Sequence, residues 1–239
     1  MNVVSSILIT GANRGLGLEF VRQYLADDWH VIATCRNTDA ATSLQELQAT
    51  YNGLQIMPLD VADFAAIDEL ASELGGRPID VLVNNAGLFG PKRQADGDLR
   101  QSFGHIDYDI WTELLRVNTL APLKLVEALI GNIAASEQKK VVTISSRIGS
   151  IGETDAGLYA YRSSKAAVNM AMATLANDVS DMGITVITFS PGWVKTDMGG
   201  PSASLEAEES IARLRGLIAE QSLEDSGAFL DYTGESIPW

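Results

Sequence analysis

The sequence predicts one α/β domain over residues 1–239, with a doubly wound parallel β-sheet of about seven strands and helices on both faces. Short apolar runs alternate with segments of helical periodicity along almost the whole chain. The runs are apolar at successive positions, which is typical of parallel strands covered on both faces. A length of 239 residues also suits a single domain with a substantial core.

The elements follow one another in βαβ order. Pro122 removes a backbone donor inside the fourth predicted helix and is expected to kink it near Asn118. Residues 88–105 and 197–204 read as loops that border a substrate pocket, and 197–204 is a candidate lid. Strands are expected at residues 7–10, 31–34, 54–59, 81–84, 141–145, 184–189 and 228–231, and helices at 15–26, 38–50, 64–74, 108–135 and 158–182.

Composition excludes several function classes. The chain has 17 Lys and Arg against 31 Asp and Glu, a net charge of −14, which argues against nucleic acid or an anionic membrane as a partner. The N-terminus lacks the basic start of a signal peptide, and no apolar run approaches the length of a spanning helix. The single cysteine, Cys35, is compatible with a reducing compartment, so we expect a cytoplasmic protein. His30 and His105 are far apart in the sequence, so no metal site is expected.

A glycine-rich segment follows the first predicted strand. Gly11, Gly15 and Gly17 stand between that strand and the start of the first helix. Strand, glycine-rich turn and helix form the arrangement that holds the pyrophosphate of a dinucleotide at a helix N-terminus. The first glycine permits the tight turn, the second a close approach to the phosphates, and the third close helix packing. The alternative is an ordinary strand–helix turn.

A second signal is the pair Tyr161 and Lys165. Residues four apart lie on one face of a helix, so the phenol and the ammonium can meet. A nearby cation lowers the pKa of a phenol from about 10, and such a phenol can exchange a proton with an alcohol or carbonyl oxygen. The spacing alone is weak evidence, because an exposed helix face explains most such pairs.

Four more features stand at strand ends or in the intervening helices. Each could be a simple turn or a chance match. Together with the glycine-rich turn and the tyrosine–lysine pair, in this order, they are very unlikely to arise by chance. They are Asn84-Asn85-Ala86-Gly87, Asn118, Ser145-Ser146 and Pro191-Gly192.

With these motifs the chain resembles the short-chain dehydrogenase/reductase family, from about Ser6 to the C-terminus. Within the family it is most similar to the branch of C-factor and sniffer-type carbonyl reductases. The resemblance implies a Rossmann-like fold that binds NAD(P). It also implies a homodimer or homotetramer joined through the long helices, where Leu120, Leu123 and Val126 could serve an interface or the core.

The resemblance assigns the catalytic roles. Tyr161 is the acid in reduction and the base in oxidation, and Lys165 lowers its pKa and holds the nicotinamide ribose. Ser146 polarises the substrate oxygen, and Asn118 positions a water that links Lys165 to solvent. Tyr159 lies six residues before Lys165, on another helix face, so Tyr161 is preferred.

Ser150 is a minor alternative to Ser146, which is the second serine of the strand-end pair.

The segment after the second strand reads Cys35-Arg36-Asn37 and has no carboxylate until Asp39. Arg36 can bind a 2′-phosphate through its planar fork of donors, which favours NADP over NAD. The residues expected at the cofactor are Gly11, Asn13, Arg14, Gly15, Leu16, Gly17, Arg36, Asp60, Val61, Asn85, Ala86, Gly87, Tyr161, Lys165, Pro191, Gly192, Val194 and Thr196.

The sequence therefore predicts an NADP-dependent oxidoreductase that transfers hydride between NADPH and a carbonyl or alcohol substrate. Cells keep NADP largely reduced, so reduction is the expected direction. Two alternatives stay open. One is a dinucleotide-binding regulatory or signalling protein of the C-factor type with little turnover. The other is an NAD-dependent alcohol dehydrogenase.

Overall fold

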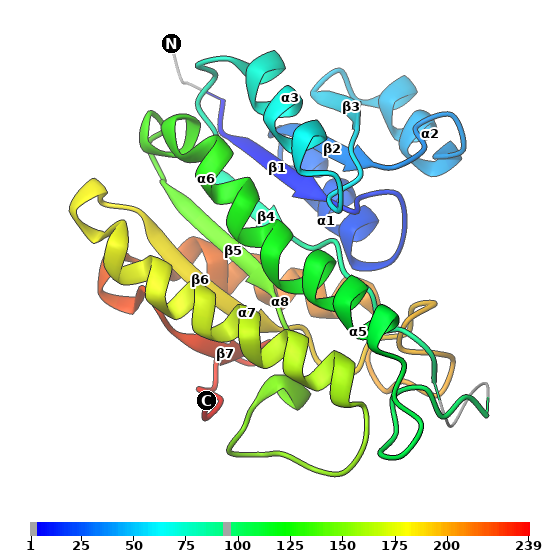
Figure 1. The fold of residues 1–239 in the computed structure, drawn as a ribbon. Coiled ribbons are helices and arrows are strands. Elements are labelled where there is room, and N and C mark those ends of the chain that lie inside the picture. The colour runs from blue at the N-terminus through cyan, green and yellow to red at the C-terminus, as the bar shows by residue number, and fades with distance from the viewer. Residues whose placement is uncertain (1–3, 93–96) are drawn as a thin grey trace.

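The computed structural model describes residues 4–92 and 97–239, and it contains one seven-stranded sheet (Figure 1). The strand order is β3-β2-β1-β4-β5-β6-β7, and every neighbouring pair is parallel. This confirms the predicted fold class. The strands are β1 (Ser6–Thr10), β2 (His30–Cys35), β3 (Leu54–Pro58), β4 (Val81–Asn84), β5 (Lys140–Ile144), β6 (Thr185–Ser190) and β7 (Phe229–Asp231).

Alternate residues of the central strands point into two separate cores. In β1, Leu8 belongs to one apolar cluster, whereas Ile7 and Ile9 belong to the other. Successive side chains of a strand point to opposite faces of the sheet, so a strand buried on both faces must be apolar throughout. The continuous apolar runs of the sequence are the result.

Helices cover both faces of the sheet (Figure 1). The first cluster packs α3 (Phe64–Leu74), α6 (Ala121–Ala134) and α7 (Tyr159–Asp178) against one face. The second packs α1 (Gly15–Ala26), α2 (Thr42–Thr50) and α8 (Ala207–Glu220) against the other. The remaining helix, α5 (Tyr108–Leu115), leads into α6 through the turn η1 (Arg116–Leu120). Short 3₁₀ turns lie at Arg147–Gly149, Ser180–Met182 and Leu223–Asp225.

The sequence analysis missed α8. This helix buries Ile211, Leu214 and Ile218 in the second core, and these residues have the three- and four-residue spacing of a helix face. The apolar pattern of the helix is interrupted by the charged residues Glu208, Glu209, Arg213, Arg215 and Glu220. Two helix ends were also wrong by four residues, whereas the other predicted ends differ by at most one residue. The second helix begins at Thr42 rather than at residue 38, and the last long helix ends at Asp178 and is followed by a 3₁₀ turn.

The predicted helix 108–135 consists of two α-helices around a π-helical turn, Arg116–Leu120. Pro122 stands in the first turn of α6, where its missing N–H is tolerated. It offers no hydrogen bond to the carbonyl of Asn118, four residues earlier. The expected disturbance near Asn118 is therefore present, as a widened turn at which the α-helical hydrogen-bond pattern is interrupted.

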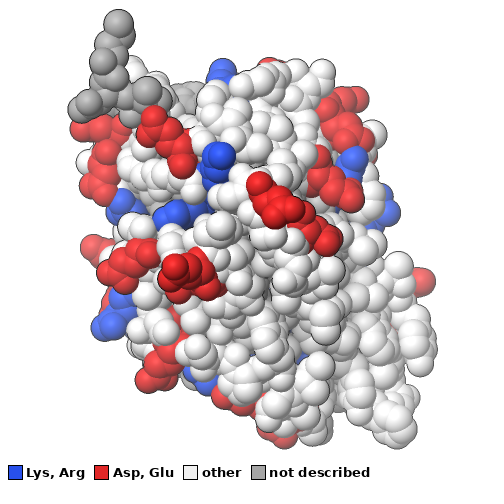
Figure 2. Space-filling model, turned by 90° about the vertical axis from the view of Figure 1, so that its left-hand side faces the viewer, with Lys and Arg blue, Asp and Glu red and all other residues white. Residues whose placement is uncertain are grey.

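Acidic and basic side chains are interspersed on the face of the molecule shown in Figure 2. No helix in the part of the chain that the structure describes combines the length and apolar character needed to cross a membrane. Of the proposed interface residues, Val126 is buried in the first core, Leu123 packs at its edge, and Leu120 is exposed.

Candidate active site

The glycine-rich turn lies at the carboxyl end of β1, where the strand order changes direction between β1 and β4. Gly11 and Gly15 have φ angles of +64° and +53°, which favour glycine. A Cβ on Gly17 would lie 2.3 Å from the carbonyl oxygen of Gly11, so no side chain fits there. The side chain of Arg14, at the N-cap of α1, makes no capping hydrogen bond. The first backbone N–H groups of α1 are therefore available to bind an anion.

Thr10 and Asn85 tie this turn to the end of β4. The Thr10 Oγ1 accepts hydrogen bonds from the backbone N–H of Asn85 at 3.1 Å and of Ala86 at 3.0 Å. The Asn85 Nδ2 donates to the carbonyl oxygens of Thr10 at 2.8 Å and Gly11 at 3.2 Å. The sequence analysis gave Thr10 no role, although a polar residue closing an apolar strand before the first glycine was a visible signal.

Two arginines lie at the expected adenosine end. Arg36 follows β2 and is exposed, and Arg14 is exposed in the turn itself. Arg14 forms an ion pair with Asp197 at 2.7 Å. Asp60 accepts a hydrogen bond from the backbone of Ala62, and the neighbouring Val61 is buried in the first core.

The proposed acid–base residues meet below the turn. Tyr161 and Lys165 are each only 5 % exposed, and the Lys165 Nζ lies 5.8 Å from the centroid of the Tyr161 ring. The Lys165 Nζ donates to the carbonyl oxygen of Ile144, at the end of β5, over 2.9 Å. A Cβ on Gly87 would lie 3.3 Å from the Asn118 Oδ1 and 3.6 Å from the Lys165 Nζ, so these groups surround one small residue.

Burial shifts the pKa values of both groups, so that at neutral pH the phenol stays protonated and the ammonium stays mostly charged. Burial raises the pKa of the Tyr161 phenol to about 12, and a side-chain hydrogen bond with Ser146 acts in the opposite direction. Burial lowers the pKa of the Lys165 ammonium to about 8. The expected lowering of the Tyr161 pKa by Lys165 stays a prediction.

The structure separates the rival residues. Ser146 lies beside the phenol, whereas Ser150 donates to the carbonyl oxygen of Pro238 at 2.5 Å. Tyr161 is buried, whereas Tyr159 is half exposed, with its ring centroid 6.5 Å from that of Phe103. Ser146 and Tyr161, the two residues preferred from the sequence, therefore lie together.

Asn118 is 1 % exposed and uses its side chain to hold other parts of the site. Its Oδ1 accepts from the backbone N–H of Leu88, and its Nδ2 donates to the Leu88 carbonyl oxygen, both at 2.8 Å. Its Nδ2 also donates to the Ser164 Oγ at 2.9 Å. Pro122 has no N–H to donate to the carbonyl of Asn118.

The segment after β6 lies over the turn. Gly192 has a φ angle of +82°, and Val194 is buried and pairs with Leu205. A Cβ on Gly15 would lie 3.4 Å from the Thr196 Cγ2. The carbonyl of Pro191 accepts from Ser210, the residue of α8 that anchors this segment, at 2.7 Å.

The loop after β4 covers the phenol. The ring of Phe89 lies 4.4 Å from that of Tyr161, centroid to centroid. Lys92 donates to the carbonyl oxygens of Asp197 and Met198, so the two loops contact each other. Gln101 is buried and hydrogen-bonds the backbone of Tyr161. The sequence analysis missed Gln101, because a lone glutamine in a polar loop carries no pattern.

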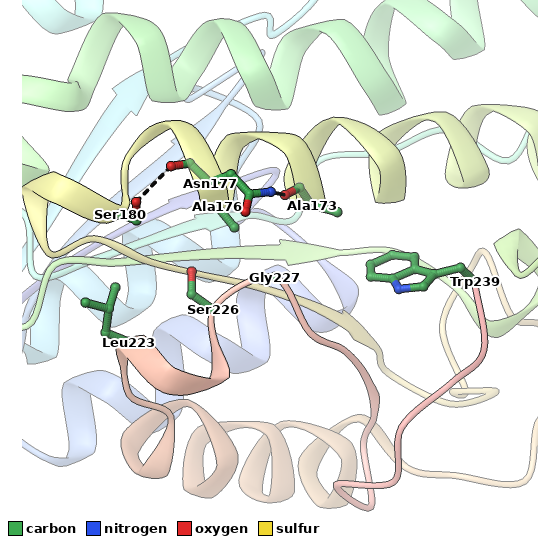
Figure 3. Close-up of a pocket in the computed structure, with 8 residues that line it drawn as sticks. All are labelled: Ala173, Ala176, Asn177, Ser180, Leu223, Ser226, Gly227 and Trp239. Carbon is green, nitrogen blue, oxygen red and sulfur yellow. Dashed lines mark hydrogen bonds between the residues drawn. The ribbon is translucent and has the colours of Figure 1, made fainter.

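A cavity of about 430 Å³ lies elsewhere on the molecule (Figure 3). Its walls are formed by the C-terminal half of α7 together with Ser180, Leu223, Ser226, Gly227 and Trp239. Ala173 is the first residue of α7 that lines the cavity, and it lies about 18 Å along the helix from Tyr161. No ionisable side chain lines it, so it is separate from the acid–base cluster. Within residues 4–92 and 97–239, no three His, Cys, Asp or Glu residues are grouped to hold a metal.

Residues 5–207 match the family model described as short chain dehydrogenase. The chain belongs to this family. The matched region contains the glycine-rich turn, the end of β4 and the tyrosine–lysine pair. The resemblance inferred from the motifs is thereby confirmed, and the chain is placed in a family of oxidoreductases.

Individual relatives agree with this placement. C-signal from Myxococcus xanthus is 39% identical over 163 residues, which covers 68% of this chain and 93% of the relative. The NADPH-bound carbonyl reductase from chicken fatty liver has a TM-score of 0.88 and 34% identity, covering 99% of both chains. Carbonyl reductase Sniffer of D. melanogaster has a TM-score of 0.86 and 31% identity, covering 99% of this chain and 100% of that one.

Proposed function

We propose that the protein is an NADP-dependent reductase of a small carbonyl compound, with Tyr161 as the proton donor. The observation that carries this proposal is the buried pair of Tyr161 and Lys165, with Ser146 hydrogen-bonded to the phenol, in a chain whose glycine-rich turn admits no side chain at Gly17. The family placement and the NADPH-bound chicken relative support it.

The site fits the proposed cofactor. The uncapped N-terminus of α1 and the missing side chain at Gly15 suit a pyrophosphate, and Gly17 lets α1 pack closely against the turn. Arg14 and Arg36 are exposed cations at the end of the site where a 2′-phosphate would lie. Asn13, Leu16, Asp60, Val61 and the residues from Pro191 to Thr196 are proposed to complete the binding surface.

Side chains of this protein can supply the proton that carbonyl reduction requires. The bound cofactor would supply a hydride to the carbonyl carbon. Ser146 would hold the carbonyl oxygen by a hydrogen bond and polarise it. The Tyr161 O–H bond would break as its proton moves to that oxygen, which gives the alcohol. The phenol is protonated at neutral pH, as reduction requires.

Lys165 and Asn118 would then restore the proton. The positive charge of Lys165 favours the phenolate that forms when Tyr161 loses its proton. A water held by the carbonyl of Asn118 would connect Lys165 to solvent and return a proton to Tyr161. The pKa of Lys165, which burial lowers to about 8, suits a group that exchanges protons near neutrality.

Calorimetric titration with NADPH and with NADH tests the cofactor, and NADPH absorbance with aldehydes, ketones and quinones tests the activity. We expect tighter binding of NADPH and turnover of at least one carbonyl. Tighter binding of NADH would favour an NAD-dependent alcohol dehydrogenase instead. Binding of neither nucleotide would contradict the interpretation of the glycine-rich turn.

A second candidate function is a dinucleotide-binding signalling protein with little turnover. The 39% identity to C-signal favours it, as does the ring of Phe89 over the Tyr161 phenol. Tight NADPH binding with no turnover on the whole panel would support this alternative. The intact acid–base cluster argues against it, because a sensor has no need of a proton donor.

We also propose a homodimer or homotetramer in the cytoplasm, with no nucleic acid or membrane partner. The exposed Leu120 and Met170, on η1 and α7, support an assembly through the long helices. Light scattering after gel filtration gives the mass of the assembly. A monomer at micromolar concentration would contradict this part of the proposal.

A further inference from the structure

The N-terminus of α7 has no cap from its own sequence. Leu158, at the N-cap, is left-handed at φ 54° and makes no side-chain cap hydrogen bond. Gly157 before it has a φ angle of +80°. A left-handed backbone is uncommon for leucine, so the chain enters this helix in a conformation that other contacts must hold. The first N–H groups of α7 need partners from elsewhere.

Gln101 supplies these partners from 60 positions away. Its side-chain Oε1 accepts the backbone N–H of Tyr161 at 2.9 Å. Its own backbone carbonyl accepts the N–H of Tyr159 at 3.2 Å. The residue is only 2 % exposed, so these bonds have little competition from water. One residue of a loop thus caps the helix that carries the proton donor.

The other end of the same amide holds the loop that covers the phenol. The Gln101 Nε2 donates to the carbonyl oxygens of Phe89 and Pro91, both at 2.8 Å. Both donors of the amide are therefore used. A Cβ on Gly90, between these two residues, would lie 3.0 Å from the Nε2. The close approach of amide and loop backbone thus depends on a glycine with a φ angle of +75°.

We propose that Gln101 is a positioning residue that holds Tyr161 and the Phe89 ring above it in one arrangement. Through this amide, the loop after β4 and the N-terminus of α7 move together. A carbonyl substrate bound against that loop is thereby placed at the phenol. The proposal deepens the proposed function and rests on it, because it takes Tyr161 as the proton donor.

Gln101→Met tests the proposal, because it keeps the side-chain length and removes every side-chain hydrogen bond. Gln101→Glu keeps the acceptor for Tyr161 but sets a carboxylate against two carbonyl oxygens. The matched control is Asn132→Leu. Asn132 is a buried amide on α6 that donates to the carbonyl oxygens of Gly75 and Arg77, both at 2.7 Å, away from the site.

We expect Gln101→Met to lower kcat by about tenfold or more, because small misplacements of reacting groups are costly. NADPH affinity should stay within about threefold, since Gln101 does not contact the glycine-rich turn. Gln101→Glu should retain more activity than Gln101→Met. Asn132→Leu should lower the melting temperature but leave kcat and its pH profile unchanged.

Phenolate absorbance gives a readout that does not need turnover. The difference between titrations of the parent and of Tyr161→Phe isolates the Tyr161 phenol. In Gln101→Met its pKa should fall from about 12 toward the ordinary value, because the phenol becomes more exposed. If the parent turns over no carbonyl, the proposed function fails and this titration still tests Gln101. An unchanged Tyr161 titration, with kcat altered no more than in Asn132→Leu, would overturn the proposal.

Discussion

The two halves of the active site are held by different kinds of contact. In the cofactor half, residues 10–17 and 84–87, glycines leave no room for further side chains, and the short side chains of Thr10 and Asn85 bind backbone groups of the turn and of the end of β4. In the substrate half, the loop after β4 and the N-terminus of α7, the side chains of Gln101 and Asn118 hold the segments together. The first half is therefore sensitive to any added atom, and the second to the loss of single polar groups.

This difference has a functional consequence. NAD and NADP carry the same pyrophosphate, so backbone N–H groups at a helix N-terminus would serve either. Substrates differ, and side chains on loops can change without disturbing the sheet. The exposed ion pair between Arg14 and Asp197 links the glycine-rich turn to the segment after β6, where Thr196 also lies close to Gly15.

Tyr161→Phe is the sharpest test of whether the cofactor half and the substrate half act separately. Removal of the hydroxyl should lower turnover by about 10²–10⁴-fold, since the proton donor is lost. NADPH binding should be almost unchanged, because the cofactor half is intact. Steady-state kinetics and calorimetric titration measure the two effects. Retained turnover would exclude Tyr161 as the acid.

In the cofactor half, Gly17→Ala should nearly abolish NADPH binding and destabilise the fold by about 1–3 kcal/mol, as overpacking does. The new Cβ would lie 2.3 Å from the Gly11 carbonyl oxygen and 2.6 Å from the Asn85 Nδ2. The control is Gly216→Ala in α8, where a Cβ meets nothing within 4 Å. It should stabilise the fold by about 0.5–1 kcal/mol. Urea unfolding and calorimetry compare the two, and equal effects would contradict the close packing at Gly17.

The buried ammonium predicts a pH dependence of stability. The folded state holds the pKa of Lys165 at about 8, below its ordinary 10.5, so the unfolded chain binds more protons between these values. The Lys165 contribution to stability should therefore rise with pH over this window, by at most about 3 kcal/mol. Urea unfolding from pH 7 to 10 should show a steeper rise for the parent than for Lys165→Met. Parallel curves would mean that the ammonium is not desolvated.

Arg36→Asp should weaken NADPH by about tenfold or more and NADH much less, because only NADPH carries the 2′-phosphate. Arg22→Asp makes the same charge change on the exposed side of α1 and controls for net charge. Calorimetric titration of each variant with both nucleotides is the measurement. An equal loss for the two nucleotides would remove Arg36 as the phosphate-binding residue.

Much of the fold was visible in the sequence. Strand β4 and helices α1 and α3 have the predicted bounds, because apolar runs and helical periodicity are local properties. Helix α8 was missed because charged residues interrupt its apolar pattern. The π-helical turn at Arg116–Leu120 was anticipated only as a kink, since proline indicates where a helix is disturbed and not how the disturbance resolves.

The sequence by itself determined the parallel α/β fold, the place of the glycine-rich turn and the spacing that sets Tyr161 beside Lys165 on one helix. Each depends on backbone preferences or on spacing within one element. Tertiary structure decided that Ser146 lies at the phenol, that Phe89 covers it and that Gln101 caps α7 from 60 residues away. These contacts join segments distant in the chain. Several use backbone N–H and C=O groups that nearly every residue carries, and such groups leave no pattern in a sequence.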